Sequence, residues 1–373
     1  MGREHSTPPA VLFVNWRDTA HPEGGGSEHY VERMAEGLVR RGYRVTIQCA
    51  AHADAPADEV VAGVRFRRRG TRFTVYLWAL IAVARMHADV IVDVQAGMPF
   101  FSRLVARCPV LVLVHHVHRE QWPAVLGPVL GRIGWWIESR VAPLLYRNCR
   151  YLTVSDETRR ELAGLGIATS RTTVVRNGLD TPPPVHAEAD PDPVLVVVGR
   201  VVPHKRVEHA VDVVARLARQ WPKLRLEVVG HGWWLDNLRR HIEQRDVGDR
   251  VTLHGFVEEQ DKHEILARSW VHLCPSVKEG WGIVIMEAAA HGVPSVAYRR
   301  AGGVTESIVD GRTGLLAEDF DDLVRQVDRL LASRSLRSSL GSAGQDRALS
   351  FAWERSVGEF EAVLVETAGL GHV

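Results

Sequence analysis

The chain has 373 residues, and its 46 Lys and Arg nearly balance its 45 Asp and Glu, which gives a formal net charge of +1. Chains of this length usually divide into domains, so we expect two domains, each with its own core. The balanced charge argues against a nucleic-acid partner, because proteins that bind nucleic acids need a broad cationic surface.

The four cysteines are scattered along the chain, with no C-x-x-C pair and no His/Cys spacing typical of zinc sites. Isolated cysteines are typical of a reducing compartment. The first residues lack the cationic region and apolar stretch of a secretory signal, and no apolar run reaches the ~20 residues of a membrane span. The sequence therefore predicts a cytoplasmic protein.

In the first half, β-branched runs alternate with segments of helical periodicity, as in βαβ units. A helix is predicted at 27–41, between the first two of the strands predicted at 11–15, 44–48, 89–94, 109–116 and 151–155. Nearly continuous apolar strands are typical of parallel sheets that are buried on both faces. The first domain is therefore predicted to be a doubly wound parallel sheet.

Residues 181–193 contain five prolines, which exclude a helix interior or a central strand and suggest a domain boundary. A second βα series follows, with strands predicted at 194–200, 224–230, 250–255, 271–276 and 293–298. Residues 319–368 are predicted to form three helices, punctuated by Gly341 and Gly344. We expect domains at 1–185 and 186–350, with a C-terminal helix within 351–373 that returns to the first domain.

The most informative stretch is 275–298, where Glu279 lies in a glycine-containing turn and Glu287 lies inside the helix that follows. Gly280 and Gly282 let backbone N–H groups approach an anion closely. The helix that begins near Gly282 and Ile283 turns its positive end to the same place. This pattern predicts a site for a diphosphate.

Two cations follow the first strand of the second half: Arg200 ends the strand, and Lys205 precedes the next helix. Ligands of open α/β sheets bind beyond the carboxyl ends of the strands, so both cations are predicted to lie beside Glu279. A departing diphosphate gathers negative charge, which such cations stabilise in place of a metal ion.

These motifs resemble the retaining glycosyltransferase family 4. The resemblance rests on G-R-x4-K from Gly199 to Lys205, on E-x7-E from Glu279 to Glu287, and on the GG-x-x-E that ends at Glu306. It also covers the opening PEGGGSEHYVERMAEGLVRRGYRVTI and the stretch TVVRNGLD at 173–180. The resemblance implies a GT-B fold, in which two Rossmann-like doubly wound parallel-sheet domains face a central cleft.

The resemblance also implies roles. Glu279 would contact the donor sugar and support the transition state, Glu287 would hold the ribose, and Arg200 with Lys205 would hold the diphosphate. In the first domain, Gly25 and Gly26 would approach the donor phosphates or the acceptor. In the second domain, backbone contacts around Gly255 would select the base of the nucleotide. Trp281 stands where a Phe is common in the family. These further substrate-binding candidates are Gly25, Gly26, Gly255, Gly280, Trp281, Gly282 and Ile283.

Three histidines, His115, His116 and His118, follow the strand predicted at 109–116. In relatives, a histidine near this strand end commonly faces the reacting sugar, and we favour His115 for a catalytic role. Side chains of an extended segment alternate between faces, so not all three histidines enter one site. A structural, hydrogen-bonded imidazole is the alternative for each of them.

No metal or other cofactor is expected. The histidine cluster lacks the spacing of a zinc site. Asp190 and Asp192 form a D-x-D pattern, as in metal-dependent sugar transferases, but they lie in the proline-rich segment, away from any strand end. We interpret that match as accidental.

The sequence therefore predicts a metal-independent, retaining hexosyltransferase with a UDP- or GDP-linked sugar as donor. The acceptor is a hydroxyl of a glycan, a lipid-linked compound or a small molecule. Alternatives are a sugar-nucleotide epimerase of the same fold and a non-catalytic sugar-nucleotide binding module. Arginines at 65–72 before an apolar segment that ends at Met86, and tryptophans near 126–146, raise peripheral membrane contact as a further hypothesis.

Overall fold

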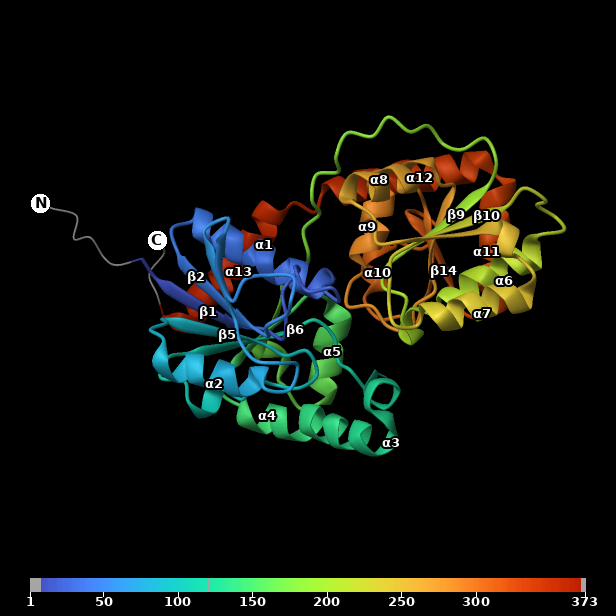
Figure 1. Ribbon diagram of the computed structural model, residues 1–373. Coiled ribbons are helices and arrows are strands. Elements are labelled where there is room, and N and C mark those ends of the chain that lie inside the picture. Colours follow the sequence, from blue (N-terminus) through green and yellow to red (C-terminus); the bar gives the residue numbers. More distant parts are fainter. Residues whose placement is uncertain (1–7, 120, 370–373) are drawn as a thin grey trace, which may run out of the picture. The chain divides into compact units, whose positions relative to one another are not determined.

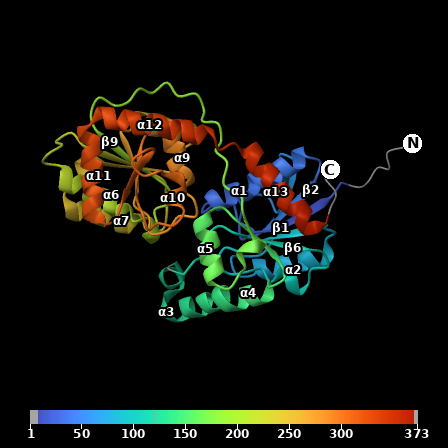
Figure 2. The ribbon, with the colours of Figure 1, turned by 180° about the vertical axis from the view of Figure 1, so that it is seen from behind.

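The protein is described by a computed structural model, which covers residues 8–119 and 121–369. Contacts divide the chain into two compact units. The first unit consists of the residues up to Gly178 together with those from Trp353 onward, and the second consists of Leu179–Ala352. Each unit has its own sheet, with helices on both of its faces (Figures 1 and 2).

The first unit is built on an eight-stranded sheet in the order β3-β4-β2-β1-β5-β6-β7-β8. Its central strands are buried along their whole length, because they are covered on both faces and consist of apolar residues, apart from the buried Asp93 of β5. The strands are β1 (Ala10–Val14), β2 (Arg44–Cys49), β3 (Asp58–Val61), β4 (Val64–Arg68), β5 (Val90–Val94), β6 (Val110–Val114), β7 (Arg150–Thr153) and β8 (Thr172–Val174).

Helices cover the two faces of this sheet (Figures 1 and 2). The helices α1 (Gly26–Arg40) and α13 (Trp353–Ala368) pack together on one face. On the other face lie α2 (Val75–Arg85), α3 (Gln121–Trp136) and α4 (Ala142–Leu145), and α3 and α4 are joined by a π-helical turn at Ile137–Val141. The helix α5 (Asp156–Gly164) follows β7 and begins at Ser155, whose hydroxyl accepts a hydrogen bond from the Thr158 N–H.

One edge of the first sheet differs from the prediction. The strand β3 pairs antiparallel with β4 as a hairpin, whereas the other pairs in this sheet are parallel. The hairpin turn consists of Ala62 and Gly63, both with positive φ, as the twist of a tight hairpin requires. The hairpin is rich in charged residues, so it lacks the apolar run by which β1, β2, β5, β6 and β7 were predicted. The short strand β8 was not predicted either.

The second unit has a six-stranded parallel sheet in the order β11-β10-β9-β12-β13-β14. Its strands are β9 (Val194–Val198), β10 (Arg225–Val229), β11 (Val251–Gly255), β12 (Val271–Cys274), β13 (Ser295–Tyr298) and β14 (Gly314–Ala317). The fold class predicted from the sequence, α/β with two Rossmann-like units, is confirmed. The cleft predicted between the units stays a prediction.

Helices connect the strands of the second unit. Gly341, which was expected to punctuate the last segment, lies inside α12, where a Cβ would be 2.0 Å from the carbonyl oxygen of Gly292. The glycine therefore lets α12 approach the end of α9 closely. The helices are α6 (Val207–Leu217), α7 (Leu235–Arg245), α8 (Glu259–Arg268), α9 (Ile283–Ala290), α10 (Val304–Ser307), α11 (Phe320–Ala332) and α12 (Arg334–Leu349).

The proline-rich segment belongs to the second unit, since the division falls at Gly178 and Leu179 rather than at 185 and 186. Contacts fix this segment to the second unit: the Asp190 N–H donates to the Arg268 carbonyl at 2.9 Å, and the indole N–H of Trp270 donates to the Asp190 carbonyl at 2.7 Å. The later division lies at Ala352 and Trp353, two residues beyond the expected 350 and 351.

The last helix is an integral part of the first unit. Phe360 of α13 is fully buried and stacks on Phe13 of β1, with ring centroids 6.0 Å apart. Gly37 of α1 lies directly against Val357, so that a Cβ at this glycine would be 2.4 Å from a methyl group. Burial of this kind contributes roughly 25 cal/mol per Å² of apolar surface.

We expect Phe360→Ala to lower the free energy of unfolding by about 3–5 kcal/mol, because it opens a cavity between α13 and β1. Thermal or urea denaturation of the full chain measures this change. The control is Glu359→Ala, which alters an exposed residue of the same helix and should change stability by less than about 0.5 kcal/mol. Equal stabilities of the two variants would contradict this role of α13.

Candidate functional site

The strand order of the second unit creates a switch point between β9 and β12, where the chain changes direction across the sheet. Ligands of open α/β sheets bind beyond the carboxyl ends of the strands at such a point. The loop after β9 carries Arg200 and Lys205, and the loop after β12 carries Glu279. The sequence thus places its predicted cations and its first carboxylate at the two loops that flank the switch point.

Lys205 and Glu279 form an ion pair across these two loops. The Lys205 Nζ is 2.6 Å from the Glu279 Oε1, and the two side chains are 21% and 11% exposed. The same carboxylate oxygen accepts a hydrogen bond from the Ser276 hydroxyl at 2.6 Å. The loops are also joined through their backbones, since the Val277 N–H donates to the His204 carbonyl at 2.8 Å. Ser276 is a site residue that the sequence analysis missed.

The pair keeps the Glu279 carboxylate ionised. Burial by itself would raise the pKa of Glu279, but the charge of Lys205 and the hydrogen bonds from Lys205 and Ser276 outweigh it and lower the pKa. The stability that this ionised group contributes is present above its pKa in the unfolded chain and is lost as the pH falls through the lower folded value. At neutral pH Glu279 is therefore a fixed negative charge and not a proton donor.

Backbone contacts hold the turn that carries Glu279. The Glu279 N–H donates to the Ala301 carbonyl at 2.8 Å, and the Gly303 N–H donates to the Glu279 carbonyl at 3.0 Å. At Gly303, a Cβ would be 2.0 Å from the carbonyl oxygen of Gly280. The GG-x-x-E segment therefore supports the turn by close backbone packing, which any side chain at Gly303 would prevent.

The helix α9 begins directly after this turn. Gly282 is its N-cap residue, with a φ of 93°, and Ile283 is its first residue and is half-buried. The left-handed conformation of Gly282 favours glycine and turns the chain sharply into the helix. The first N–H groups of α9 therefore lie next to the ion pair in the sequence, as the predicted anion site requires.

Glu287 also lies on α9, but its partner comes from α8. Lys262 Nζ is 2.9 Å from Glu287 Oε1 and 2.7 Å from Glu259 Oε2. Burial would lower the pKa of Lys262, but the two carboxylates raise it instead. Lys262 was not a predicted site residue, because its contact with Glu287 depends on how two helices pack and leaves no local pattern.

Trp281 does not line a ligand site through its side chain. Its indole is 1% exposed and packs against the Phe351 ring, with ring centroids 4.9 Å apart at an interplanar angle of 72°. The Ser307 hydroxyl donates to the Trp281 carbonyl. The side chain of Trp281, a substrate-binding candidate by sequence, is therefore part of the core beneath the turn.

Gly255 ends β11 with a φ of 70°, and its carbonyl accepts a hydrogen bond from the Gly230 N–H at 2.8 Å. Gly230 in turn lies so close to the loop after β9 that a Cβ would be 2.0 Å from the Gly199 carbonyl. The next residue, Phe256, is 82% exposed. Three loops at one edge of the sheet are thus packed backbone to backbone beside Arg200, which is half-buried.

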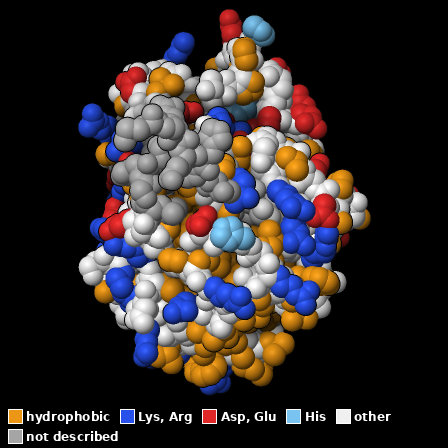
Figure 3. Space-filling view, turned by 90° about the vertical axis from the view of Figure 1, so that its left-hand side faces the viewer, with side chains coloured by type: hydrophobic (Ala, Val, Ile, Leu, Met, Phe, Trp, Pro, Cys, Tyr) orange, Lys and Arg blue, Asp and Glu red, His pale blue; other side chains and the backbone are white. Residues whose placement is uncertain are grey.

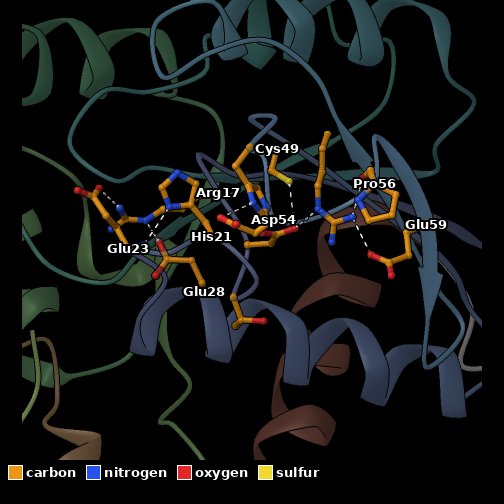
Figure 4. A network of polar contacts seen from close by, with 12 residues as sticks. Arg17, His21, Glu23, Glu28, Cys49, Asp54, Pro56 and Glu59 are labelled. Carbon is orange, nitrogen blue, oxygen red and sulfur yellow. Dashed lines mark hydrogen bonds and ion pairs between the residues drawn. The ribbon is translucent and has the colours of Figure 1, made fainter. Parts of the chain in front are cut away.

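In the first unit, buried charges fix the loop that leads to Gly25 and Gly26. Arg17 pairs with Glu28 of α1 at 3.0 Å and with Glu23 at 2.8 Å. Glu28 also accepts the Gly25 N–H at 2.9 Å, which caps α1 where Gly26 begins it. Figure 4 shows Arg17 between the carboxylates of Glu23 and Glu28.

A second part of the network in Figure 4 joins the carboxyl ends of β1, β2 and β4. Asp18 is 1% exposed, pairs with the Arg68 guanidinium, and lies 3.1 Å from the His52 Nε2. The Cys49 thiol donates to Asp18, and burial raises the pKa of this thiol, so it stays protonated. Arg68, one of the arginines at 65–72 for which membrane contact is a hypothesis, is buried in this network.

The three predicted histidines have different surroundings. His115 is 8% exposed, packs edge-on against Tyr30 at 5.3 Å, and has no hydrogen-bond partner at its Nε2. His116 lies 3.0 Å from the Gln121 Nε2, and its ring lies 4.1 Å from that of His118. The Nδ1 of His118 is 3.2 Å from the Glu138 Oε1. His116 and His118 therefore form one cluster, and His115 is separate from it.

Glu138 is the centre of that cluster, although the sequence analysis did not single it out. It is 2% exposed and accepts hydrogen bonds from the His118 backbone N–H at 3.1 Å and from the Trp122 indole at 2.6 Å. It lies in the π-helical turn Ile137–Val141, a type of irregularity that is frequent at functional sites. Glu138 is the single carboxylate in the mostly apolar segment 126–146, and this feature of the sequence could have indicated a functional role for it.

Both aspartates of the D-x-D pattern form ion pairs with basic residues. Asp190 pairs with Arg225 at 2.7 Å, and Asp192 pairs with Lys223 at 3.0 Å. Within residues 8–119 and 121–369, no group of three or more His, Cys, Asp or Glu side chains is arranged to hold a metal ion. The expectation of a metal-independent site stays a prediction.

We expect Gly303→Ala to lower stability by about 1–3 kcal/mol and to displace the turn that carries Glu279, because the new methyl group would overlap the Gly280 carbonyl. Thermal denaturation measures the effect. The control is Gly248→Ala in the same unit, where a Cβ would meet nothing within 4 Å. A Gly303→Ala variant as stable as the control would refute the close contact.

We expect His115 to stay neutral in the folded chain well below the usual pH of imidazole titration, because burial lowers its pKa from 6.5 to about 4. The unfolded imidazole takes up a proton first, so the stability that this group contributes is complete above pH 6.5 and falls as the pH drops toward 4. Nitrogen-detected NMR of the imidazoles, assigned with His115→Asn, measures the titration. Protonation of His115 near pH 6.5 in the folded protein would contradict its burial.

Comparisons with known proteins agree with this arrangement. Residues 180–347 match the model of the family described as glycosyl transferases group 1, and residues 24–183 match glycosyltransferase family 4. The glycogen synthase of Mycobacterium tuberculosis is 34% identical over 92% of this chain and 91% of its own. The structure of Anabaena HepE in complex with UDP and glucose superposes with a TM-score of 0.75 at 17% identity, covering 96% of this chain and 100% of that one.

A protein of Mycolicibacterium smegmatis, described as a GDP-mannose-dependent alpha-(1-6)-phosphatidylinositol monomannoside mannosyltransferase, is 34% identical over 42% of this chain and 43% of its own length. The chain spans less than half the length of the first two curated relatives that it matches, 18% and 43%. The two family models together extend from residue 24 to 347, across both units. The chain belongs to the glycosyl transferases group 1, with the family 4 type of first unit and the GT-B fold.

Proposed function

We propose that the protein is a retaining, metal-independent glycosyltransferase that moves a hexose from a UDP- or GDP-linked sugar to an acceptor hydroxyl. The observation that carries this proposal is the Lys205–Glu279 pair at the switch point of the second sheet. It places a fixed cation and a fixed anion beside the start of α9, where a diphosphate and the sugar attached to it each find a complementary charge.

The proposed reaction breaks the bond between the anomeric carbon and the donor phosphate oxygen, and forms a bond from the same carbon to the acceptor oxygen. The acceptor hydroxyl attacks on the face from which the phosphate leaves, so the anomeric configuration is retained. The acceptor proton passes to the departing phosphate oxygen, and no protein base is needed. Glu279, ionised as its lowered pKa requires, stabilises the positive charge that develops on the sugar.

Lys205 and Arg200 have the complementary role on the leaving group. A cation at ~4 Å from a phosphate charge contributes up to about 4 kcal/mol at an intermediate dielectric, before desolvation. Lys205 is held in position by Glu279, so it is already oriented when the donor binds. This pre-organised charge supports the proposal that the site works without a divalent metal ion.

Glu287 is proposed to hold the ribose, with Lys262 fixing the orientation of its carboxylate. A nucleotide-linked donor is supported by two related proteins, because one is described as GDP-mannose-dependent and the other was solved with UDP and glucose. These two differ in the base, so both nucleotides remain in the proposal. A glycan, a lipid-linked compound or a small molecule would supply the hydroxyl.

The first unit is proposed to bind the acceptor near Gly25, Gly26 and the three histidines. His115, buried and neutral, would meet the reacting sugar as a hydrogen-bonding group and not as a cation. The cytoplasmic location inferred from the scattered cysteines stays a prediction. No observation favours an epimerase or a non-catalytic binding module over a transferase.

We expect one nucleoside diphosphate sugar to be hydrolysed slowly by the wild type in the presence of EDTA, when uridine, guanosine, adenosine and thymidine diphosphate sugars are compared. Glu279→Gln and Lys205→Met should each lower this turnover by a factor of roughly 10²–10³, because each removes a charge that the transition state needs. Release of the nucleoside diphosphate is measured by chromatography, and NMR of a transferred sugar gives the anomeric configuration.

The matched control for this experiment is Lys223→Met, which removes an exposed lysine whose partner is Asp192 and should leave turnover unchanged. Turnover that requires added divalent metal would refute metal independence. An inverted product would refute retention, and full activity of Glu279→Gln would remove the basis for assigning the site.

A further inference from the structure

The first unit exposes a set of large apolar side chains on neighbouring helices. On α3, Val129, Leu130, Ile133 and Trp136 are 71%, 57%, 50% and 58% exposed, and Leu144 of α4 is 68% exposed. Their spacing of one, three and three residues places the four side chains of α3 along one face of that helix. Isolated exposed apolar residues are common, but a contiguous row of this kind indicates an interaction surface.

Glycines on the opposite side of α3 explain why this face points outward. The helix is kinked at Gly127, which has a φ of 74°, and the first turn folds back on the rest. A Cβ at Gly131 would be 2.8 Å from the backbone of Pro123, and one at Gly134 would be 2.4 Å from the Trp122 ring. The glycine side is thus packed against the first turn, and the apolar side is left exposed.

The helix α2 extends the same surface. Phe73 lies just before α2 and is 71% exposed. Within α2, Leu77 is 60% exposed and Trp78 is 42% exposed. Figures 1 and 2 show α2, α3 and α4 on the same face of the first sheet, and buried residues of α2 and α4 share one core cluster. We call the exposed apolar residues of these three helices and Phe73 the apolar face.

The charges around the apolar face are almost entirely positive. Residues 121–150 contain four arginines and a single carboxylate, Glu138, which is buried. Arg132, Arg140 and Arg147 are exposed, as are Arg72 and Arg85 at the ends of the α2 region. Figure 3 shows apolar side chains gathered at the lower end of the first unit, with Lys and Arg side chains around them.

We propose that the apolar face docks the protein on an anionic lipid bilayer. Apolar residues enter the boundary between headgroups and acyl chains, the arginines bind anionic headgroups, and the tryptophans lie at the interface, as such side chains prefer. Within the described parts of the chain, no helix has both the length and the apolar character needed to cross a membrane. The proposed contact is peripheral, and each arginine near the surface adds about a fivefold gain in affinity.

Charge complementarity favours a bilayer over a second copy of the chain. A twofold dimer through this face would bring like surfaces together, so that arginines of one copy would face arginines of the other. The docking helix is also tied to the predicted substrate residues, because Glu138 bonds both Trp122 of α3 and His118. The docking surface thus adjoins the histidine cluster.

The test is flotation of the full chain with vesicles of phosphatidylcholine, either alone or mixed with phosphatidylglycerol, at low salt. We expect the wild type to float with the mixed vesicles only. The double variant Ile133→Gln, Trp136→Gln should bind at least about tenfold more weakly, and Arg132→Gln and Arg140→Gln about fivefold more weakly each. Controls are Leu349→Gln and Arg239→Gln, which change exposed residues of the second unit and should float like the wild type.

The inference is overturned if the wild type does not float with the mixed vesicles, or if the double variant floats as well as the wild type. It is also overturned if sedimentation velocity without vesicles shows a dimer that the double variant abolishes, since a second copy then covers the face. Donor hydrolysis without vesicles separates this inference from the proposed function. A variant that loses flotation but keeps hydrolysis supports docking, whereas flotation without hydrolysis of any donor refutes only the transferase proposal.

Discussion

The ion pair between Lys205 and Glu279 depends on a constraint that governs the whole second unit. Parallel strands joined by crossovers carry their following loops at one edge of the sheet, and the strand order brings the loops after β9 and β12 together there. Two residues 74 positions apart in the chain thereby meet at 2.6 Å. Without the switch point, a buried carboxylate at Glu279 would have no cation beside it, and its burial would cost several kcal/mol.

Close backbone packing turns this constraint into a rigid site. The glycines at 230 and 303 lie so near to neighbouring carbonyl groups that no side chain fits, and each joins loops that follow different strands. In the first unit, the same task is done by buried charges, with Arg17 and Arg68 joining the loops and strand ends around the start of α1. The second unit therefore fixes its loops through close backbone contacts at glycines, and the first unit fixes its loops through buried ion pairs.

Most of the fold could be predicted from the sequence, because continuous apolar runs and helical periodicity are local signals. The grouping of Arg200, Lys205 and Glu279 at one sheet edge also followed, since all three come directly after predicted strands. The rest depends on tertiary packing. The ion pair of Lys262 with Glu287 requires the packing of α8 against α9. The sequence also does not show whether an aromatic side chain in a glycine-containing turn contacts a ligand or packs into the core. Only the contact with Phe351 decides that Trp281 belongs to the core.

The position of α13 has a consequence for the order in which the protein is made. The second unit is continuous in sequence, whereas the first unit needs Phe360 to cover Phe13, near the opposite end of the chain. On the ribosome, the sheet of the first unit is synthesised first, but the part of its apolar face beside α1 that α13 covers stays exposed until α13 emerges. The second unit, although made later, can close before it. The first unit therefore stays incomplete until α13 has been synthesised. During this time its exposed apolar surface must be protected from aggregation.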